Sequence, residues 1–315
     1  MQARICTSKI CTMKKATTGR QILNNWQLYL LVLPALVYII IFNYLPMYGV
    51  QIAFRNFRAV DGITGSVWTG LSHFKTFFET FYSSRLIINT FLLNFYGLLF
   101  GFPIPIILAI LINSLRSKVF KKFTQTVVYV PHFISTVVMA GMIYIFLSPV
   151  SGIINMMITG LGGQVIFFMN EEVWFRPVFI ISGIWQSAGW SSILYIAALA
   201  GVDQELYEAA TIDGATKFLK VIHIDLPHLL PIVTMMLILN CGSLLSSATE
   251  KALLFQTGGN IARSDIIGTY VYTMGLTQGQ FSYTAAIGLL VNLVNFAMII
   301  SVNQIVKQMK GETLF

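Results

Sequence analysis

Six long apolar stretches most strongly limit what this chain can fold into. Each is close to the roughly 20 residues that an α-helix needs to cross a bilayer, and only helices and closed barrels satisfy their backbone hydrogen bonds in lipid. Only 10% of the 315 residues are charged, against about 25% in soluble domains. The sequence therefore predicts an all-α integral membrane protein with six transmembrane helices. The six runs are 28–48, 90–113, 127–147, 175–200, 229–248 and 285–306.

The basic residues predict how these helices are oriented. With the N-terminus inside, 13 of the 20 Lys and Arg residues fall in inner segments and seven in outer segments. The densest group is RSKVFKK at 116–122, in a short loop, where an excess of positive charge best indicates the cytoplasmic side. We therefore expect a multi-pass protein with both termini in the cytoplasm. The net charge of +8 is then a topology signal with attraction to anionic membrane lipid, not a nucleic-acid surface.

The runs and the segments between them divide the chain into parts. Within the outer segment, residues 50–86, the four phenylalanines from Phe74 to Phe81 recur at helical spacing, which predicts a helix along the membrane surface. The transmembrane core, residues 87–306, contains a charged cytoplasmic loop at 203–228. In chain order the parts are a cytoplasmic tail (1–26), the first transmembrane helix (27–49), the outer segment (50–86), a five-helix transmembrane core (87–306) and a cytoplasmic C-terminal tail (307–315).

The charged loop reads ELYEAATIDGATKFLKVIHIDLP at 205–227. Its first part contains good helix formers, Gly214 permits a turn that other residues resist, and Pro227 is expected to end the second part before the fifth span. An amphipathic connector lying on lipid would favour basic residues, whereas this loop sets carboxylates beside the small Ala209 and Ala210. The residues therefore favour a docking element for a cytoplasmic protein, with an interfacial connector as the alternative.

The same loop resembles a known motif. Its spacing is EAA, three residues, Gly, nine residues, Ile, one residue and Leu-Pro, and every fixed position matches the EAA loop of ABC importer permeases. FKKFTQTVVYVPHFIS, AALAGVDQELYEAATIDGA and QGQFSY extend the resemblance to the LplB-like subgroup of binding-protein-dependent sugar permeases. One departure is QTGGN at 256–260, where sugar permeases commonly have TGGGP.

The resemblance implies a type I ABC importer permease fold and a permease subunit for oligosaccharides or polysaccharide fragments in a bacterial cell membrane. It implies a second permease, forming a heterodimer, two cytoplasmic ATP-binding subunits and an extracytoplasmic sugar-binding protein. ATP and Mg would be bound by the ATPase subunits and no cofactor by this chain, which has no GxxxxGK[ST] phosphate loop. The residues implied to couple to the ATPase are Glu208, Ala209, Ala210, Asp213, Gly214, Lys217, Ile224, Leu226 and Pro227.

Polar residues inside the apolar runs are candidates for the substrate path, because a polar group at membrane depth must face protein or a wet cavity. Gln186 and Trp190 are four residues apart and share a helix face, so an amide and an aromatic ring would be available to a sugar. Interhelical packing explains the same residues equally well. The candidates are Trp185, Gln186, Trp190, Asn240, Asn292 and Asn295.

Two other classes of function are disfavoured. An ion-coupled secondary transporter usually has an ionisable residue near the middle of the membrane, and none lies deep within the six runs. An intramembrane enzyme needs nucleophilic, acidic or metal-binding residues at one depth, whereas the four histidines fall in scattered loops and span ends. The sequence therefore predicts no catalytic residues and no metal site.

Overall fold

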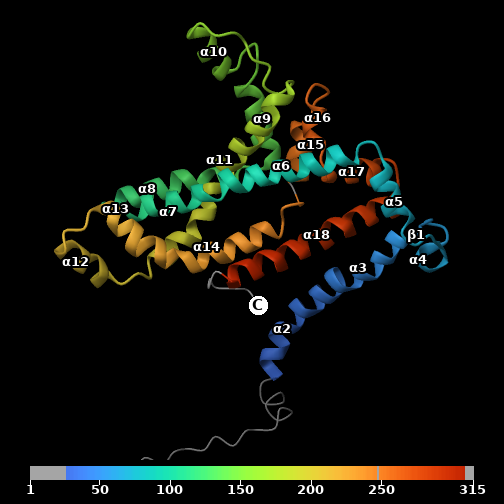
Figure 1. Ribbon diagram of the computed structural model, residues 1–315, viewed down its shortest axis with the longest axis horizontal. Coiled ribbons are helices and arrows are strands. Elements are labelled where there is room, and N and C mark those ends of the chain that lie inside the picture. The colour runs from blue at the N-terminus through green and yellow to red at the C-terminus, as the bar shows by residue number, and fades with distance from the viewer. Residues whose placement is uncertain (1–25, 247, 309–315) are drawn as a thin grey trace, which may run out of the picture. The chain divides into compact units, whose positions relative to one another are not determined.

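The structure is a computed structural model that describes residues 26–246 and 248–308 (Figure 1). Two compact units are distinguished, 1–51 and 52–315. In the described part of the first, α2 (Trp26–Ile39) continues through a π-helical turn (Ile40–Tyr44) into α3 (Leu45–Met47). None of these residues is buried, as suits an apolar helix that faces lipid. The predicted tail lies outside the described residues, apart from Trp26.

The second unit begins with a small subdomain that follows a 3-10 segment (Tyr48–Phe54). Strands β1 (Arg55–Asn56) and β2 (Val67–Trp68) pair antiparallel around α4 (Gly62–Gly65), so a two-stranded ribbon supplements the helical fold. α5 (Ser72–Glu79) follows. Phe78 is exposed, but Phe77 is buried against Tyr283 and Ile287 of the last helix. The predicted surface helix is thus held by protein contacts through one of its phenylalanines.

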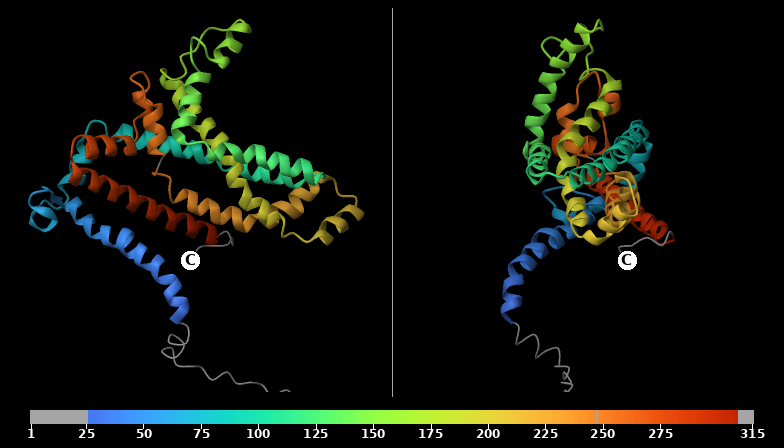
Figure 2. Two further views of the ribbon diagram at one scale, coloured as in Figure 1. Left: turned by 180° about the vertical axis from the view of Figure 1, so that it is seen from behind. Right: turned by 90° about the vertical axis from the view of Figure 1, so that its left-hand side faces the viewer.

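The rest of the second unit is helical. α14 and α18 pack together and lie side by side in all views (Figures 1 and 2). The helices are α6 (Ser83–Gly101), α7 (Pro103–Asn113), α8 (Lys118–Tyr129), a 3-10 turn (Val130–Phe133), α9 (Thr136–Phe146), α10 (Ile153–Gly160), α11 (Glu172–Leu199), α12 (Gln204–Ile212), α13 (Lys217–Lys220), a π-helical turn (Val221–Asp225), α14 (Leu226–Cys241), α15 (Thr249–Phe255), α16 (Ile261–Ser264), α17 (Ile267–Tyr272), a π-helical turn (Thr273–Thr277) and α18 (Phe281–Gln308).

The expectation of six transmembrane helices is not confirmed. Within the described residues, four helical segments are long and apolar enough to cross a membrane, or five if one bent pair counts as a span. The bent pair replaces the predicted third run: α8 and α9 meet at 99°, and the Ser135 side chain caps the start of α9. α11 is long enough but lacks the required apolarity, because Gln186, Ser187 and Ser191 lie near its middle. The four segments are Trp26–Phe54, Ser83–Asn113, Lys217–Cys241 and Phe281–Gln308.

α11 is the central helix of the second unit and contacts α6, α7, α8, α14, α15 and α16. Its approach to α8 depends on Gly189, where an added Cβ would overlap the carbonyl oxygen of Val128. Small residues at such crossings allow helices in lipid to pack closely. Gly189 thus allows the closest passage between α11 and the bent third segment.

Replacing Gly189 with alanine should lower the stability of the folded chain by about 1–3 kcal/mol, because the backbone of α8 must move to accept the methyl group. Thermal unfolding in detergent measures this effect. Gly141→Ala in α9 is the matched control, because no heavy atom lies within 4 Å of its added Cβ. Equal unfolding temperatures for Gly189→Ala and the unmodified chain would contradict the close approach.

Candidate functional site

The charged loop forms a helical hairpin. Asp203 caps α12 by accepting a hydrogen bond from the Glu205 amide at 3.1 Å, and the Thr216 hydroxyl caps α13 by accepting from the Leu219 amide at 3.4 Å. Between the two helices Gly214 has φ +74°. This left-handed conformation suits glycine, which has no Cβ. The predicted turn at Gly214 is therefore confirmed.

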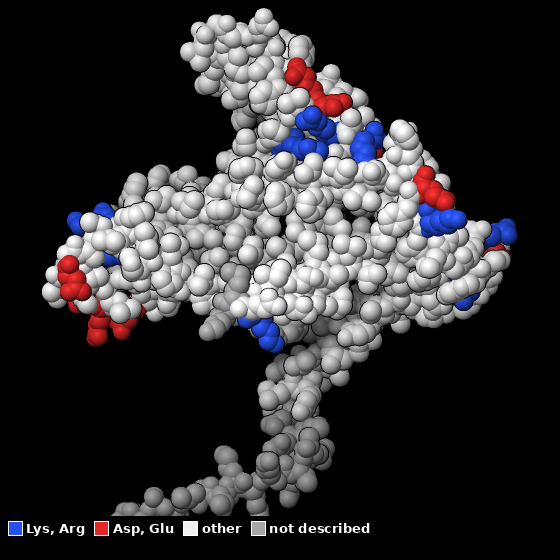
Figure 3. Space-filling view, in the orientation of Figure 1, with Lys and Arg blue, Asp and Glu red and all other residues white. Residues whose placement is uncertain are grey.

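The hairpin surface is both acidic and apolar. Its exposed carboxylates form no ion pair with another described residue, and acidic side chains gather over α12 in Figure 3. Exposed apolar side chains accompany them, with Ile212 87% exposed. An exposed apolar patch with a charged rim is typical of a protein interaction site. The carboxylates are those of Glu205, Glu208 and Asp213, and the large apolar side chains are those of Leu206, Ile212 and Phe218.

The residues predicted to couple to an ATPase divide into two groups by burial. Ala210 and Ile224 are half-buried, and Ile224 packs against the apolar cluster that contains Leu229. The others are exposed, as a contact with a separate protein requires: Glu208, Ala209, Asp213, Gly214, Lys217, Leu226 and Pro227.

The predicted role of Pro227 as a terminator is wrong. The helix runs from Lys217 through the π-helical turn to Cys241 without a break. Pro227 lies in the first turn of α14, where the missing amide hydrogen is tolerated and the π-helical turn just before it adjusts the backbone. The second arm of the hairpin is therefore continuous with a membrane-spanning helix.

Tyr207 and Asp225 join the two arms. The Tyr207 hydroxyl donates a short hydrogen bond to the buried carboxylate of Asp225, and Lys220 Nζ donates to the Tyr207 carbonyl oxygen at 3.2 Å. Burial, together with the bond to Asp225, raises the pKa of the Tyr207 phenol above its usual value, so the phenol remains a donor at neutral pH. α12 is thus attached by hydrogen bonds to the base of the α14 span.

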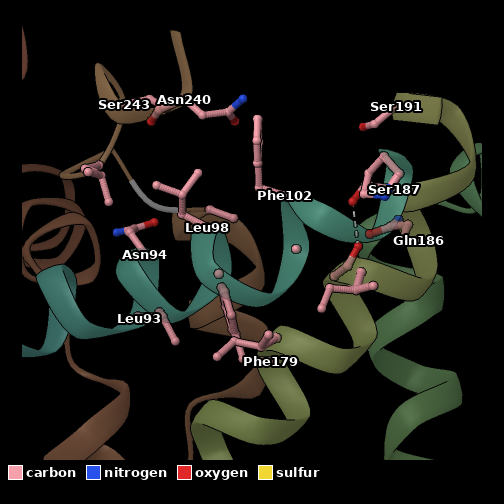
Figure 4. Close-up of a pocket in the computed structure, with 18 of the residues that line it drawn as sticks. Leu93, Asn94, Leu98, Phe102, Phe179, Gln186, Ser187, Ser191, Asn240 and Ser243 are labelled. Atoms are coloured by element: carbon pink, nitrogen blue, oxygen red, sulfur yellow. Dashed lines mark hydrogen bonds between the residues drawn. The ribbon is translucent and has the colours of Figure 1, made fainter. Parts of the chain in front are cut away.

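The second feature is a cavity of about 460 Å³ between α6, α7, α11, α14 and α15 (Figure 4). In this view Asn94, Asn240 and Ser243 lie on one side of Phe102, and Gln186 lies on the other side with two serines of α11. Neutral amide and hydroxyl groups on an apolar wall suit a ligand rich in hydroxyl groups. The neutral polar lining residues are Asn94, Gln186, Ser187, Ser191, Tyr195, Asn240, Ser243 and Ser246.

The profile of one protein family matches residues 101–311, and the family is described as "Binding-protein-dependent transport system inner membrane component". The chain belongs to this family. It is therefore a multi-pass membrane protein that serves as a transport subunit and not as an enzyme.

Individual relatives agree with this membership. Protein LplB of Bacillus subtilis (strain 168) is 43% identical over 93% of this permease and 92% of LplB. YteP of the same organism, a polygalacturonan/rhamnogalacturonan transport system permease, is 41% identical over 91% of this chain and 90% of its own. The resemblance to sugar permeases of the LplB-like subgroup is thereby confirmed.

The fold also matches solved importers. A chain of a bacterial ABC transporter involved in the import of the acidic polysaccharide alginate superposes with a TM-score of 0.85 at 36% identity, covering 92% of this chain and 98% of that one. A chain of a bacterial alginate ABC transporter, in complex with a periplasmic protein bound to alginate pentasaccharide, gives 0.86 at 35% identity, over 94% and 99%. The permease therefore has the fold of an ABC importer permease.

Of the predicted substrate-path residues, two line the cavity. Gln186 and Asn240 do so, although each also donates a hydrogen bond to a backbone carbonyl oxygen. Trp185 and Trp190 are not among its lining residues. Trp190 stacks on His132 at 4.5 Å between ring centroids, so it packs α11 against the bent third segment.

The two asparagines of α18 do not line the cavity either. Asn292 is exposed. Asn295 is buried, accepts from the Leu245 amide at 3.0 Å and donates to Ser246 Oγ at 2.8 Å. Asn295 thus fixes the segment after α14, and a substrate-path role for the two asparagines stays a prediction.

A further cavity residue was not found from the sequence. Lys251 counted there as one of the outer basic residues, but it lines the cavity and is only 5% exposed. Its position in TEKALLF, where four apolar residues follow the adjacent charges of Glu250 and Lys251, is a signal of burial that could have identified it.

Proposed function

We propose that this permease is one of two membrane subunits of a type I, ATP-driven importer that depends on a binding protein. Its cargo is an oligosaccharide or a fragment of a polysaccharide. The cavity between α6, α7, α11, α14 and α15 is this subunit's share of the translocation path. The hairpin of α12 and α13 couples that path to ATP hydrolysis by separate subunits.

One observation carries the proposal: the hairpin offers an acidic and apolar surface whose carboxylates pair with no described residue, and it is continuous with a helix long and apolar enough to cross a membrane. Force applied to α12 reaches α14 through the Tyr207–Asp225 hydrogen bond and through the uninterrupted helix. Rigid movement of packed helices about a few hinge positions is the usual way that such a push opens one side of a cavity. The resemblance of the loop to the EAA motif supports the same assignment.

The carbohydrate cargo is supported by the cavity and by the relatives. Amide and hydroxyl groups in the lining match the hydroxyl groups of a sugar. The relatives include permeases named for polygalacturonan, rhamnogalacturonan and arabinooligosaccharides.

The remaining parts of the assembly follow from this role. The partners are a second, different permease, two cytoplasmic ATP-binding subunits that hold ATP and Mg, and an extracytoplasmic sugar-binding protein. The protein lies in a bacterial cell membrane with the hairpin and both termini on the cytoplasmic side. The basic residues support that orientation.

Reconstitution tests the proposed function. The permease pair, the ATPase subunits and the binding protein are placed in vesicles, and uptake of labelled oligosaccharides is followed. We expect uptake that requires ATP and stops when either the ATPase subunits or the binding protein is omitted. Uptake driven by an ion gradient without ATP would contradict the proposal.

The chain purified alone should not bind ATP, since it has no phosphate-binding loop. Equilibrium binding of a fluorescent ATP analogue measures this, with the isolated ATPase subunit as the positive control. Saturable, Mg-dependent binding by the permease alone would overturn the division of labour between the subunits.

A further inference from the structure

The cavity contains one charged side chain among its described lining residues, that of Lys251 in α15. Its Nζ donates a hydrogen bond to the Phe179 carbonyl oxygen at 2.5 Å and lies 4.4 Å from the ring centroid of Phe179 and 5.6 Å from that of Phe255. An ammonium group has three N–H donors. Phe179 is the single hydrogen-bond partner of this ammonium group among the described residues.

Among the described residues, no carboxylate pairs with this charge. None of the ion pairs between them includes Lys251, whereas Arg85 of the same unit pairs with Asp265 at 3.4 Å. Burying an ammonium group without an anion is costly, so buried charges in proteins are normally paired with an opposite charge. Within the described part of the chain, the Lys251 ammonium group therefore lacks a counter-ion.

The helix opposite is shaped to admit this ammonium group. Gly183, one turn after Phe179 in α11, also lines the cavity, and an added Cβ there would lie 2.9 Å from Lys251 Nζ. Because glycine has no Cβ, α11 leaves room for the Lys251 ammonium group at this part of the cavity wall. A purely structural lysine that clamps α15 to α11 would need only the bond to Phe179, which a neutral donor could also make.

We propose that Lys251 binds a carboxylate group of the cargo inside the cavity, so that the imported carbohydrate is an acidic oligosaccharide containing uronic acid residues. The inference rests on the proposed function. The neutral amides and serines would hold the hydroxyl groups while Lys251 supplies the counter-ion. A carboxylate bound by a desolvated ammonium group forms an ion pair as well as a hydrogen bond, whereas a neutral ester can only accept the hydrogen bond.

A binding measurement distinguishes a carboxylate-binding Lys251 from a purely structural one. It uses the reconstituted importer without the binding protein, so that only the membrane cavity is tested. The probes are galacturonate and mannuronate oligomers and their methyl esters of equal length. The intact importer should bind at least one acid about 10- to 100-fold more tightly than its ester. Lys251→Met, which keeps the length and loses the charge, should remove this preference by weakening binding of the acid far more than binding of the ester.

Asn94→Leu is the matched control, because it removes a neutral polar group from the same cavity. It should weaken acid and ester equally and so preserve the preference. Equal affinity of the intact importer for acids and esters would overturn the inference, as would an undiminished preference in Lys251→Met. If neutral oligosaccharides alone bind and are taken up with ATP, the inference fails while the proposed function stands. If the complete importer takes up no carbohydrate with ATP, both fail.

Discussion

Replacing Gly214 with valine should abolish ATP-driven uptake while leaving the chain in the membrane. Gly214 has φ +74°, and holding a non-glycine residue in such a conformation costs about 1–3 kcal/mol, most for β-branched residues. The turn would relax, and α12 would no longer present its surface at the required angle to α13. Uptake in reconstituted vesicles and co-purification of the ATPase subunit measure the loss.

Gly214→Asn is the matched control, because asparagine tolerates the left-handed region and no atom lies within 4 Å of an added Cβ. It should keep most of the activity. Glu208→Arg tests the surface without the turn, since Glu208 is exposed and has no ion pair among the described residues. Normal uptake by both Gly214→Val and Glu208→Arg would rule out the hairpin as the coupling element.

Replacing Tyr207 with phenylalanine should uncouple ATP hydrolysis from transport. The buried Asp225 carboxylate would lose the donor that ties it to α12. Such a loss costs about 1–3 kcal/mol, so the sugar moved per ATP hydrolysed should fall by about fivefold or more. Parallel measurements of uptake and phosphate release give this ratio, and the amount of assembled complex shows whether association is intact.

The double variant Tyr207→Phe with Asp225→Leu is the informative control. Replacing both members of a buried hydrogen bond with apolar groups of similar shape is often nearly neutral. The double variant should therefore be better coupled than Tyr207→Phe alone. An unchanged ratio of uptake to ATP hydrolysis in the single variant would show that this hydrogen bond does not connect hairpin and span.

The hairpin was predictable because its features are local. A turn at Gly214 and a helix capped by Asp203 depend on backbone preferences of neighbouring residues, which the sequence states directly. The role of Pro227 was not predictable in this way. Proline both ends helices and begins them, and the π-helical turn before it allowed the two segments to join into one.

The membrane location and the family were likewise determined by the sequence alone. Apolar runs long enough to cross a membrane must form helices there, and the EAA motif has a fixed spacing. The 99° bend between α8 and α9 was decided by tertiary structure. Hydropathy measures how apolar a run is and carries no information on its direction. Packing of α8 against Gly189 of α11 fixes that direction.

The surroundings of single polar residues were decided only by the folded chain. The sequence made both Asn295 and Gln186 candidates for the substrate path. In the structure, Asn295 forms hydrogen bonds to the segment after α14, whereas Gln186 lines the cavity. Lys251 looked like an outer charge and is buried. The physical reason is that burial and partners depend on residues distant in the chain, whereas helix formation and membrane insertion depend on neighbouring ones.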